Sequence, residues 1–397
     1  DATRWLLRAG RAALDAAAWS DAAQQFERAL ALAGDVDDRC RAGTGLGRAL
    51  RALGDAERGR VTIETALALA QAHRRGRAAA EAALALVGGG GRGVAIDLDD
   101  PERTNLLRTG LEGLTDDDVD LLVPTLGELA LSLVLTDAKA ERDALAERCV
   151  AEARRADDPD LLASALLTRR IALMGPEGTH ARVTDTLEVL AFADGSVAPE
   201  RVLAAHLALI EDLIELGDRA GVDRALTAAT ELASRLAHPY WSWATRSWTA
   251  LAAIIDGRFA EAESLALAAL EHQAPAEHPE AMAAFGVNLV DIRLFQGRAA
   301  EVIELLRGAA EANPHIPCYR AVLALCCAES GDVEGAREAY EVFARTGFVL
   351  PPDSNWLLSV AVLADVAATL GDTAGGALLS AALRPFADRH VVLNCFG

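Results

Sequence analysis

The stretch Asp256-Gly257-Arg258-Phe259-Ala260-Glu261-Ala262-Glu263 joins two apolar segments through a glycine followed by a charged residue. The same turn recurs along the chain, at Gly54-Asp55, Gly217-Asp218, Gly257-Arg258, Gly297-Arg298, Gly331-Asp332 and Gly371-Asp372. The last five turns are spaced 40, 40, 34 and 40 residues apart. A period of this length with one turn per unit predicts stacked helix pairs, that is, an α-solenoid. Since a solenoid presents an extended binding surface, the pattern favours binding over catalysis.

The composition supports an all-α chain. Of its 397 residues 52% are hydrophobic but only 5% are aromatic, so Ala and Leu supply most of the core. Both are strong helix formers, and no long stretch shows the alternation typical of a strand. A length of 397 residues suggests two or three domains, but stacked repeats share one elongated core.

The net charge of −21 argues against direct contact with nucleic acid. Lys139 is the single lysine, and the arginines are spread along the chain. Binding to DNA needs clustered positive charge, whereas this balance favours solubility and repels acidic surfaces. No run of 18 or more residues is free of charges and apolar, so no membrane span is expected.

The first two units match the tetratricopeptide (TPR) pattern of small and large residues. Small residues are expected where helices cross, and large ones fill the spaces between them. The matching positions are Gly10, Trp19, Ala22, Phe26 and Ala29 in the first unit, and Leu46, Gly47, Leu50, Gly59, Ile63 and Ala66 in the second. At each turn the glycine is expected to end one helix in the left-handed conformation, and the aspartate to cap the next. We therefore predict a TPR-like, right-handed superhelix of antiparallel helix pairs.

The repeat is regular over residues 1–87 and 199–397 and degenerate over 88–198, and we expect these three regions to form one continuous solenoid. In the middle region, Gly88-Gly89-Gly90-Gly91 is followed by Arg92-Gly93-Val94 rather than by the Lys-Ser/Thr of a phosphate-binding loop, which favours an inter-repeat loop. Helices are expected over Pro101–Glu112, from Leu121 to Ala156, from Asp160 to Met174, and up to about Ala193. Asp116-Asp117-Asp118 is expected to cap the second of these.

Several stretches carry a resemblance to a known family. They are Asp256 to Glu263, Gln296-Gly297-Arg298, Asp353-Ser354-Asn355-Trp356-Leu357-Leu358, Leu370-Gly371-Asp372, Leu383-Arg384-Pro385-Phe386-Ala387-Asp388-Arg389-His390-Val391-Val392, and Ala18 to Leu30 near the start. Together they resemble the C-terminal helical-repeat region of large bacterial ATP-binding transcriptional regulators. These include LuxR-type (LAL) and SARP-type regulators with an AAA/STAND ATPase, and ATPase-bearing adenylate cyclases also share the region. The combination of Asn355-Trp356-Leu357 with Pro385 to Val392 is the most specific part.

The resemblance implies a cytoplasmic sensor or protein-interaction arm that is a fragment of a longer protein. Its partner would be another protein, the ATPase domain of the same protein, or a small effector. The chain has no Walker A motif and no basic recognition helix, so ATP binding and DNA binding would lie outside it, and no cofactor is expected. The alternatives are the repeat region of an adenylate cyclase, a structural dimerisation scaffold, and a stand-alone helical enzyme.

Two groups of residues are candidates for binding. The densest aromatic cluster consists of Tyr240, Trp241, Trp243 and Trp248. It either packs in the core or forms, with Arg246 nearby, one side of a ligand site. In a TPR stack the first helix of each pair lines the concave groove, and threading the repeat places a polar row there. That row consists of Glu211, Ser247, Asp291 and Asp365, with Asn288 one turn from Asp291. Trp356 completes the set of binding candidates. Solvated helix faces are the plainer interpretation of the row.

Catalytic and metal sites are not expected. The histidines are scattered, and Glu271-His272 and Glu277-His278 do not form a zinc-binding His-Glu-x-x-His motif. No cysteine pair has zinc-ligand spacing. We therefore expect the cysteines to act as small buried hydrophobes; they are Cys40, Cys149, Cys318, Cys326, Cys327 and Cys395.

Overall fold

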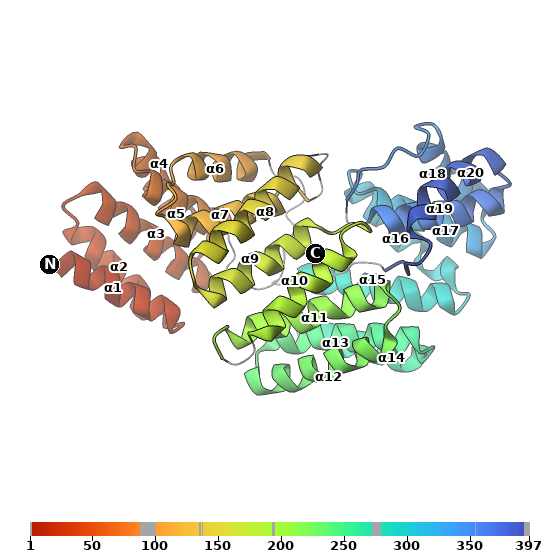
Figure 1. The fold of residues 1–397 in the computed structure, drawn as a ribbon, viewed down its shortest axis with the longest axis horizontal. Helices are drawn as coiled ribbons and strands as arrows, with labels where there is room; N and C mark the ends of the chain where they lie inside the picture. Colours follow the sequence, from red (N-terminus) through yellow and green to blue (C-terminus); the bar gives the residue numbers. More distant parts are fainter. Residues whose placement is uncertain are drawn as a thin grey trace. The chain divides into compact units, whose positions relative to one another are not determined.

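The computed structural model describes residues 2–87, 101–134, 136, 138–192, 195–271, 279–353 and 355–392. Within these residues it has twenty α-helices, two short 3₁₀ helices and no strand, which confirms the all-α prediction (Figure 1). The chain forms two compact units. Unit 1 contains the described residues up to Leu133 and from Ala140 to Thr168. Unit 2 contains the described residues from Val134 to Lys139 and from Arg169 onward. The division into 1–87, 88–198 and 199–397 stays a prediction.

Unit 1 is built from helices that pair with their neighbours in sequence. They are α1 (Ala2–Asp15), α2 (Trp19–Leu32), α3 (Val36–Ala52), α4 (Ala56–Ala72), α5 (Gly76–Val87), α6 (Pro101–Glu112), α7 (Val119–Leu131), α8 (Lys139–Arg155) and the first part of α9 (Pro159–Ala172). The boundary between the units falls inside α9.

Unit 2 continues the same arrangement. Its helices are α10 (Thr179–Ala191), α11 (Pro199–Glu215), α12 (Arg219–Leu236), α13 (Pro239–Ile255), α14 (Phe259–Glu271), α15 (Pro279–Phe295), η1 (Ala299–Val302), α16 (Ile303–Ala312), α17 (Pro317–Ser330), α18 (Val333–Ala344), α19 (Trp356–Leu370), α20 (Thr373–Leu383) and η2 (Arg384–Phe386). Helix α11 pairs with α12 and α13 pairs with α14 (Figure 1), and α13 packs on both α11 and α15. Stacking of pairs through their first helices is the arrangement of a TPR-like α-solenoid.

The recurring turn has the predicted conformation at all six positions. The φ angles of the six glycines lie between +68° at Gly297 and +88° at Gly54, in the left-handed region. At Gly217 the N–H of Asp218 donates to the carbonyl oxygen of Leu213 over 2.8 Å, and the N–H of Gly217 to Ile214 over 2.9 Å. Such paired bonds satisfy carbonyls that have no partner within the helix. The glycine is therefore needed to end the first helix of each pair.

The residue after the glycine caps the next helix only where it is aspartate. Asp218, Asp332 and Asp372 each accept a hydrogen bond from the main-chain N–H three residues later, at 2.8 to 2.9 Å, and Asp55 does so at 3.4 Å. Arg258 and Arg298 cannot cap in this way. Arg298 instead donates to Glu301 Oε1, 2.7 Å away. The predicted caps are confirmed for the Gly-Asp turns.

Close helix crossings in unit 1 depend on glycine. A Cβ added at Gly47 would lie 2.3 Å from Cγ1 of Ile63 and 2.6 Å from the carbonyl oxygen of Gly59. A Cβ at Gly10 would lie 2.9 Å from the ring of Phe26. The small and large positions that the TPR pattern assigned to α1–α4 therefore pack against each other as predicted.

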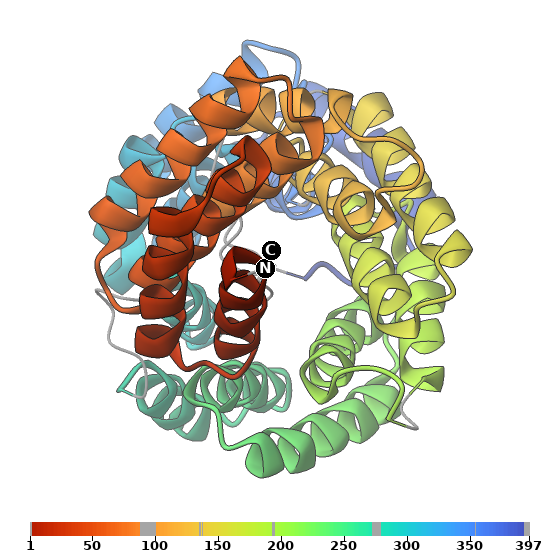
Figure 2. The same cartoon turned by 90° about the vertical axis from the view of Figure 1, so that its left-hand side faces the viewer.

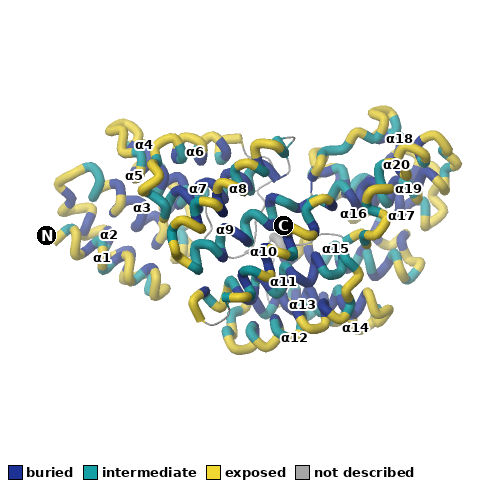
Figure 3. The backbone as a smooth tube through the Cα atoms, viewed as in Figure 1, coloured by how far each residue is buried: buried dark blue, intermediate teal, exposed yellow. Residues whose placement is uncertain are grey.

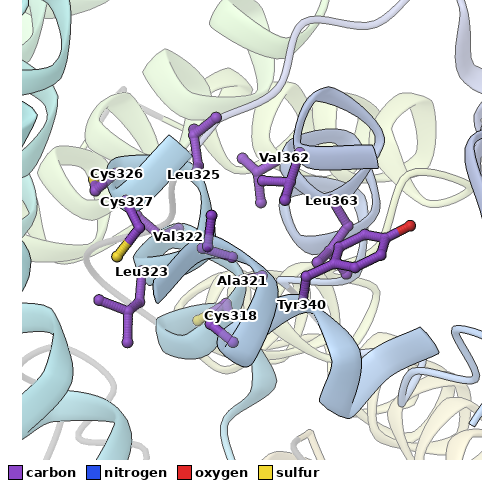
Figure 4. Close-up of a cluster of buried hydrophobic side chains, with 14 of the residues drawn as sticks. Cys318, Ala321, Val322, Leu323, Leu325, Cys326, Cys327, Tyr340, Val362 and Leu363 are labelled. Carbon is purple, nitrogen blue, oxygen red and sulfur yellow. The ribbon is translucent and has the colours of Figure 1, made fainter. Parts of the chain in front are cut away.

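Each unit has its core in its interior (Figure 3). The helices bury one face there and expose the opposite face to solvent. A large cluster in unit 2 is centred on α17, with Ala321, Val322 and Leu325 packed toward Val362 and Leu363 of α19 (Figure 4). The five cysteines within the described residues are buried and form no disulfide, which agrees with their predicted role as small buried hydrophobes. They are Cys40, Cys149, Cys318, Cys326 and Cys327, while Cys395 lies outside the described residues.

The middle region departs from the sequence prediction in two places. The helix expected to continue from Leu121 to Ala156 is two helices, α7 and α8. Asp118 occupies the N-cap position of α7, but its carboxylate accepts hydrogen bonds from Thr115 and from Arg77 rather than from the helix. The loop at Gly88 to Gly91 lies outside the described residues.

Candidate functional site

Unit 2 contains a group of buried, ion-paired side chains on α9, α10 and α11. We call Arg170, Arg182, Glu211, Asp212 and Glu215 the buried charge cluster. Asp212, on α11, is completely buried and lies between the two guanidinium groups. Its Oδ2 is 3.1 Å from Nε of Arg170, and its Oδ1 is 2.7 Å from Nε of Arg182. Asp212 thereby joins α11 to both α9 and α10.

The other two carboxylates extend the cluster in opposite directions along α11. Glu211 accepts from Nη2 of Arg170 at 2.7 Å. Glu215, one turn later, accepts from Nη2 of Arg182 and from the hydroxyl of Thr179. Paired charges of this kind are costly to break, because a partner left alone stays buried.

Burial shifts the ionisation of this cluster. It raises the pKa of Glu215 above the usual glutamate value and outweighs the opposing effects of Arg182 and the Thr179 hydroxyl. Burial also lowers the pKa of Arg170, but the charges of Asp212 and Glu211 more than offset it, so the pKa of that guanidinium is raised. Arg170 is therefore charged at every physiological pH, and Glu215 is more easily neutralised by acid than an ordinary glutamate.

The cluster forms one wall of a small pocket of about 30 Å³. A cavity of this size holds a water molecule. The lining residues come from the α9–α10 loop, α10, α11, the start of α19 and the C-terminal segment; they are Met174, Gly175, Pro176, Arg182, Glu211, Glu215, Leu357, His390 and Val392. The pocket combines buried charge on one side with apolar surface on the other.

The C-terminal segment, Ala387 to Val392, returns from η2 to the end of α11. The main-chain N–H of His390 donates to the carbonyl oxygen of Glu215 over 2.8 Å. Nε of Arg389 lies 3.9 Å from Oε1 of Glu215, and the Arg389 side chain is only 12% exposed. The imidazole covers the turn after α11, since a Cβ on Gly217 would lie 2.9 Å from Nε2 of His390. In Figure 2 the dark-blue end of the chain lies beside the yellow-green helices.

The two most specific stretches of the family resemblance meet at this site. The rings of Trp356 and Phe386 are in edge contact, with centroids 5.8 Å apart, and Leu357 lines the same pocket as His390 and Val392. The N-terminus of α19 therefore anchors the start of the C-terminal segment. Sequence reasoning found both stretches separately but gave no signal that they are neighbours in space.

The groove candidates lie on the first helices of their pairs, as the threading predicted. Glu211 is on α11, Ser247 on α13, and Asp365 on α19, while Asn288 and Asp291 are on α15. Their exposure differs, because Glu211, Ser247 and Asn288 are buried, Asp291 is half-buried and Asp365 is exposed. They do not form a continuous row open to solvent. Of these five, Glu211 lines the pocket.

The aromatic candidates pack in the core. Trp241, Trp243 and Trp248 are each no more than 5% exposed, and Tyr240 contacts both Trp241 and Trp243, with ring centroids 5.0 and 5.3 Å apart. This burial favours core packing of α13 over an aromatic wall for a ligand. Arg246, on the same helix, is half-buried.

Asn288 and Asp291 form a second polar feature on α15. Oδ1 of Asn288 is buried and has no hydrogen-bond partner within the described residues. Burial raises the pKa of Asp291 from the ordinary 3.8 to about 7. A carboxyl group of this kind can carry a proton near neutral pH. Burial, with smaller contributions from nearby charges that include Asp291, raises the pKa of the Cys326 thiol, so this neighbouring thiol is poorly ionised.

The remaining chemistry of the described residues is sparse. They contain no group of three or more His, Cys, Asp or Glu side chains suited to hold a metal ion. Across the same ranges, no helix combines the length and apolar character that crossing a bilayer requires. His272 and His278 lie outside the described residues.

The comparisons place the chain among helical-repeat folds. No protein-family model matches the sequence, and no curated protein matches it. The structure of a Rap protein complexed with competence and sporulation factor is similar, with a TM-score of 0.60 and 12% identity over 97% of both chains. A STAND protein with a tetratricopeptide repeat sensor from Pyrococcus horikoshii has a TM-score of 0.51 and 12% identity. This match covers 97% of the present chain and 52% of that one. These similarities establish a TPR-like fold.

Proposed function

We propose that the chain is a sensor and protein-interaction arm of a cytoplasmic, bacterial, multidomain transcriptional regulator of the LuxR-type class. It would bind a partner protein, its own ATPase domain or a small effector, and it would perform no catalysis and contact no nucleic acid itself. The net charge of −21 supports the last point, because it repels a polyanion.

The observation that carries the proposal is the pocket in unit 2. It places the charged groups Arg182, Glu211 and Glu215 beside apolar surface from Met174 and Leu357. Polar groups fixed beside apolar side chains are typical of ligand recognition. The similar Rap structure holds a competence and sporulation factor, which supports a binding role for a fold of this kind.

The regulator context is supported by a second similarity. The STAND protein joins an ATPase to a TPR sensor, and the stretches that resemble ATP-binding regulators meet at the pocket through Trp356 and Phe386. An arm of this sort works as a two-state element whose contacts a ligand biases.

The direct test is isothermal titration of the chain with the ATPase domain encoded in the same gene, and with a panel of candidate effectors. We expect one of them to bind with micromolar or better affinity. Glu211→Gln should weaken binding at least tenfold, whereas Asp365→Asn, an exposed carboxylate of the same predicted row, should not. A folded chain that binds none of these partners would rule out the sensor role.

A further inference from the structure

The buried charge cluster has an excess of negative charge, and the C-terminal segment places an arginine beside it. As defined, it contains three carboxylates, Glu211, Asp212 and Glu215, and two guanidinium groups. Arg389 brings a third guanidinium group, whose Nε lies 3.9 Å from Glu215 while its Nη1 lies 3.3 Å from Asp388 of the same segment. A carboxylate left without enough positive charge in a buried site is destabilising. The site therefore favours a cation at the position that Arg389 occupies.

The end of α11 contributes a second contact, a hydrogen bond to the main chain of the bound segment. The carbonyl oxygen of Glu215 belongs to the last turn of its helix, where carbonyls lack helical partners. The N–H of His390 satisfies it. A positive charge near a helix C-terminus is also favoured by the helix dipole, so Arg389 and His390 are held by the same helix end.

Apolar contact supplies the third determinant. Val392 and Leu357 line the pocket together with Met174 and Pro176. The imidazole of His390 packs over Gly217. In sequence it lies between the cationic residue, Arg389, and the apolar residue, Val392. An occupant thus needs a free main-chain N–H, an arginine before it, a planar ring and an apolar residue two positions later.

We propose that the surface formed by the end of α11 with Met174, Pro176 and Leu357 is a binding site for a short arginine-containing peptide segment, and that Arg389 to Val392 of the chain itself is its resident occupant. This deepens the proposed function, on which it rests, by assigning the chemistry of the partner. A segment of a partner protein with the same features can bind this site only when it displaces Arg389 to Val392. Its apparent affinity is reduced by the fraction of molecules in which the site is free.

The first measurement is hydrogen exchange of the His390 amide in the full chain. We expect protection in the wild type and its loss in the double variant Arg389→Ala/His390→Ala, in which the amide is retained at position 390. Arg384→Ala is the matched control, because Arg384 is an exposed arginine in the preceding turn and does not line the pocket. An amide at position 390 that exchanges at the unprotected rate in the wild type would overturn the proposal.

The second measurement uses a labelled peptide with the sequence of residues 385–392, Pro-Phe-Ala-Asp-Arg-His-Val-Val, followed by fluorescence anisotropy. We expect it to bind the double variant at least tenfold more tightly than the wild type or Arg384→Ala. A tenfold change means that the segment is docked in about nine-tenths of wild-type molecules. A peptide carrying Arg389→Glu should not bind.

Equal affinity for the wild type and the double variant, or no binding to either at millimolar peptide, would refute the inference. Titration of both proteins with the ATPase domain and the effector panel separates this result from the proposed function. A chain that binds such a partner but not the peptide retains the sensor role and loses the assigned site. Matching thermal unfolding curves confirm that the variants are folded.

Discussion

The hydroxyl of Tyr340 donates a hydrogen bond to Oδ2 of Asp372 over 2.9 Å, and so ties α18 to the turn that begins α20. Oδ1 of the same aspartate accepts from the N–H of Gly375 at 2.9 Å. One carboxylate therefore caps a helix and links two successive repeats. Cooperation between neighbouring repeats of a solenoid depends on contacts of this kind.

Tyr340→Phe is expected to lower the free energy of unfolding of unit 2 by about 1 kcal/mol, because one partly buried hydrogen bond is lost while the packing is kept. Asp372→Ala should cost more, since it removes the cap as well. Urea unfolding followed by circular dichroism measures both. A smaller loss for Asp372→Ala than for Tyr340→Phe would contradict the shared role of this carboxylate.

The caps at the Gly-Asp turns can be tested against a Gly-Arg turn. Asp332→Ala removes the hydrogen bond to the N–H of Gly335 and should lower the stability of unit 2 by about 1 kcal/mol, the usual value for an N-cap. Arg258→Ala changes the same turn position without removing a cap, and should leave the unfolding midpoint unchanged. Equal losses in the two variants would count against the capping role.

The crossing of α3 and α4 should not tolerate a methyl group. Gly47→Ala places a Cβ 2.3 Å from Ile63 and 2.6 Å from a main-chain oxygen, and we expect a loss of about 2 kcal/mol or more from overpacking. Gly308→Ala in α16 meets nothing within 4 Å and should stabilise the chain by about 0.5 to 1 kcal/mol through helix propensity. Thermal unfolding distinguishes the two, and a neutral Gly47→Ala would disprove the tight crossing.

The half-buried carboxyl of Asp291 predicts a pH-dependent stability. Burial raises its pKa from 3.8 to about 7, so the folded state binds this proton more tightly than the unfolded state. The resulting stabilisation is complete below pH 3.8 and is lost as the pH rises to about 7. Asp291→Asn should therefore exceed the wild type in stability at pH 8 by about 1 to 2 kcal/mol, less than the roughly 4 kcal/mol of the full shift, because solvent screens a half-exposed carboxylate.

The difference between Asp291→Asn and the wild type should shrink toward zero near pH 4. Melting curves from pH 4 to pH 8 provide the measurement. Asp365→Asn, which removes an exposed carboxylate on α19, is expected to leave the curve unchanged. An advantage of Asp291→Asn that is constant with pH would show that packing, and not titration, is responsible.

The buried charge cluster should respond strongly to loss of one arginine. Arg182→Met leaves Asp212 and Glu215 buried without their shared guanidinium, and we expect a loss of about 3 to 5 kcal/mol. The exposed pair of Arg345 with Glu341 provides the control, because Arg345→Met should change stability by about 0.5 kcal/mol or less. A cycle combining Arg182→Met with Glu215→Gln should show positive coupling.

Local patterns allowed much of the fold to be predicted. The Gly-Asp turn depends on hydrogen bonds that span at most five residues, such as Asp218 to Leu213, so its conformation follows from nearby sequence. The crossing at Gly47 also follows from the repeat, because the pattern fixes which positions of α3 and α4 face each other.

The candidate site could not be predicted in the same way. The contact of His390 with Glu215 joins residues in different repeats, and no periodicity specifies that the C-terminal segment returns to α11. Glu211 was found as a polar residue on a first helix, but its burial depends on Arg170, which lies in the degenerate region. Trp241 was ambiguous, because an aromatic residue at helical spacing fits a core and a ligand wall equally well.

The six glycine turns are alike in conformation, yet they differ in what surrounds them. A Cβ would meet nothing within 4 Å at Gly54, Gly257, Gly297, Gly331 and Gly371, whereas at Gly217 it would meet His390. An element that elsewhere only reverses the chain direction has acquired a neighbour at one repeat. In evolutionary terms, a repeat array can gain a specialised receptor surface without altering its repeat, by changing only the segment that folds over one turn.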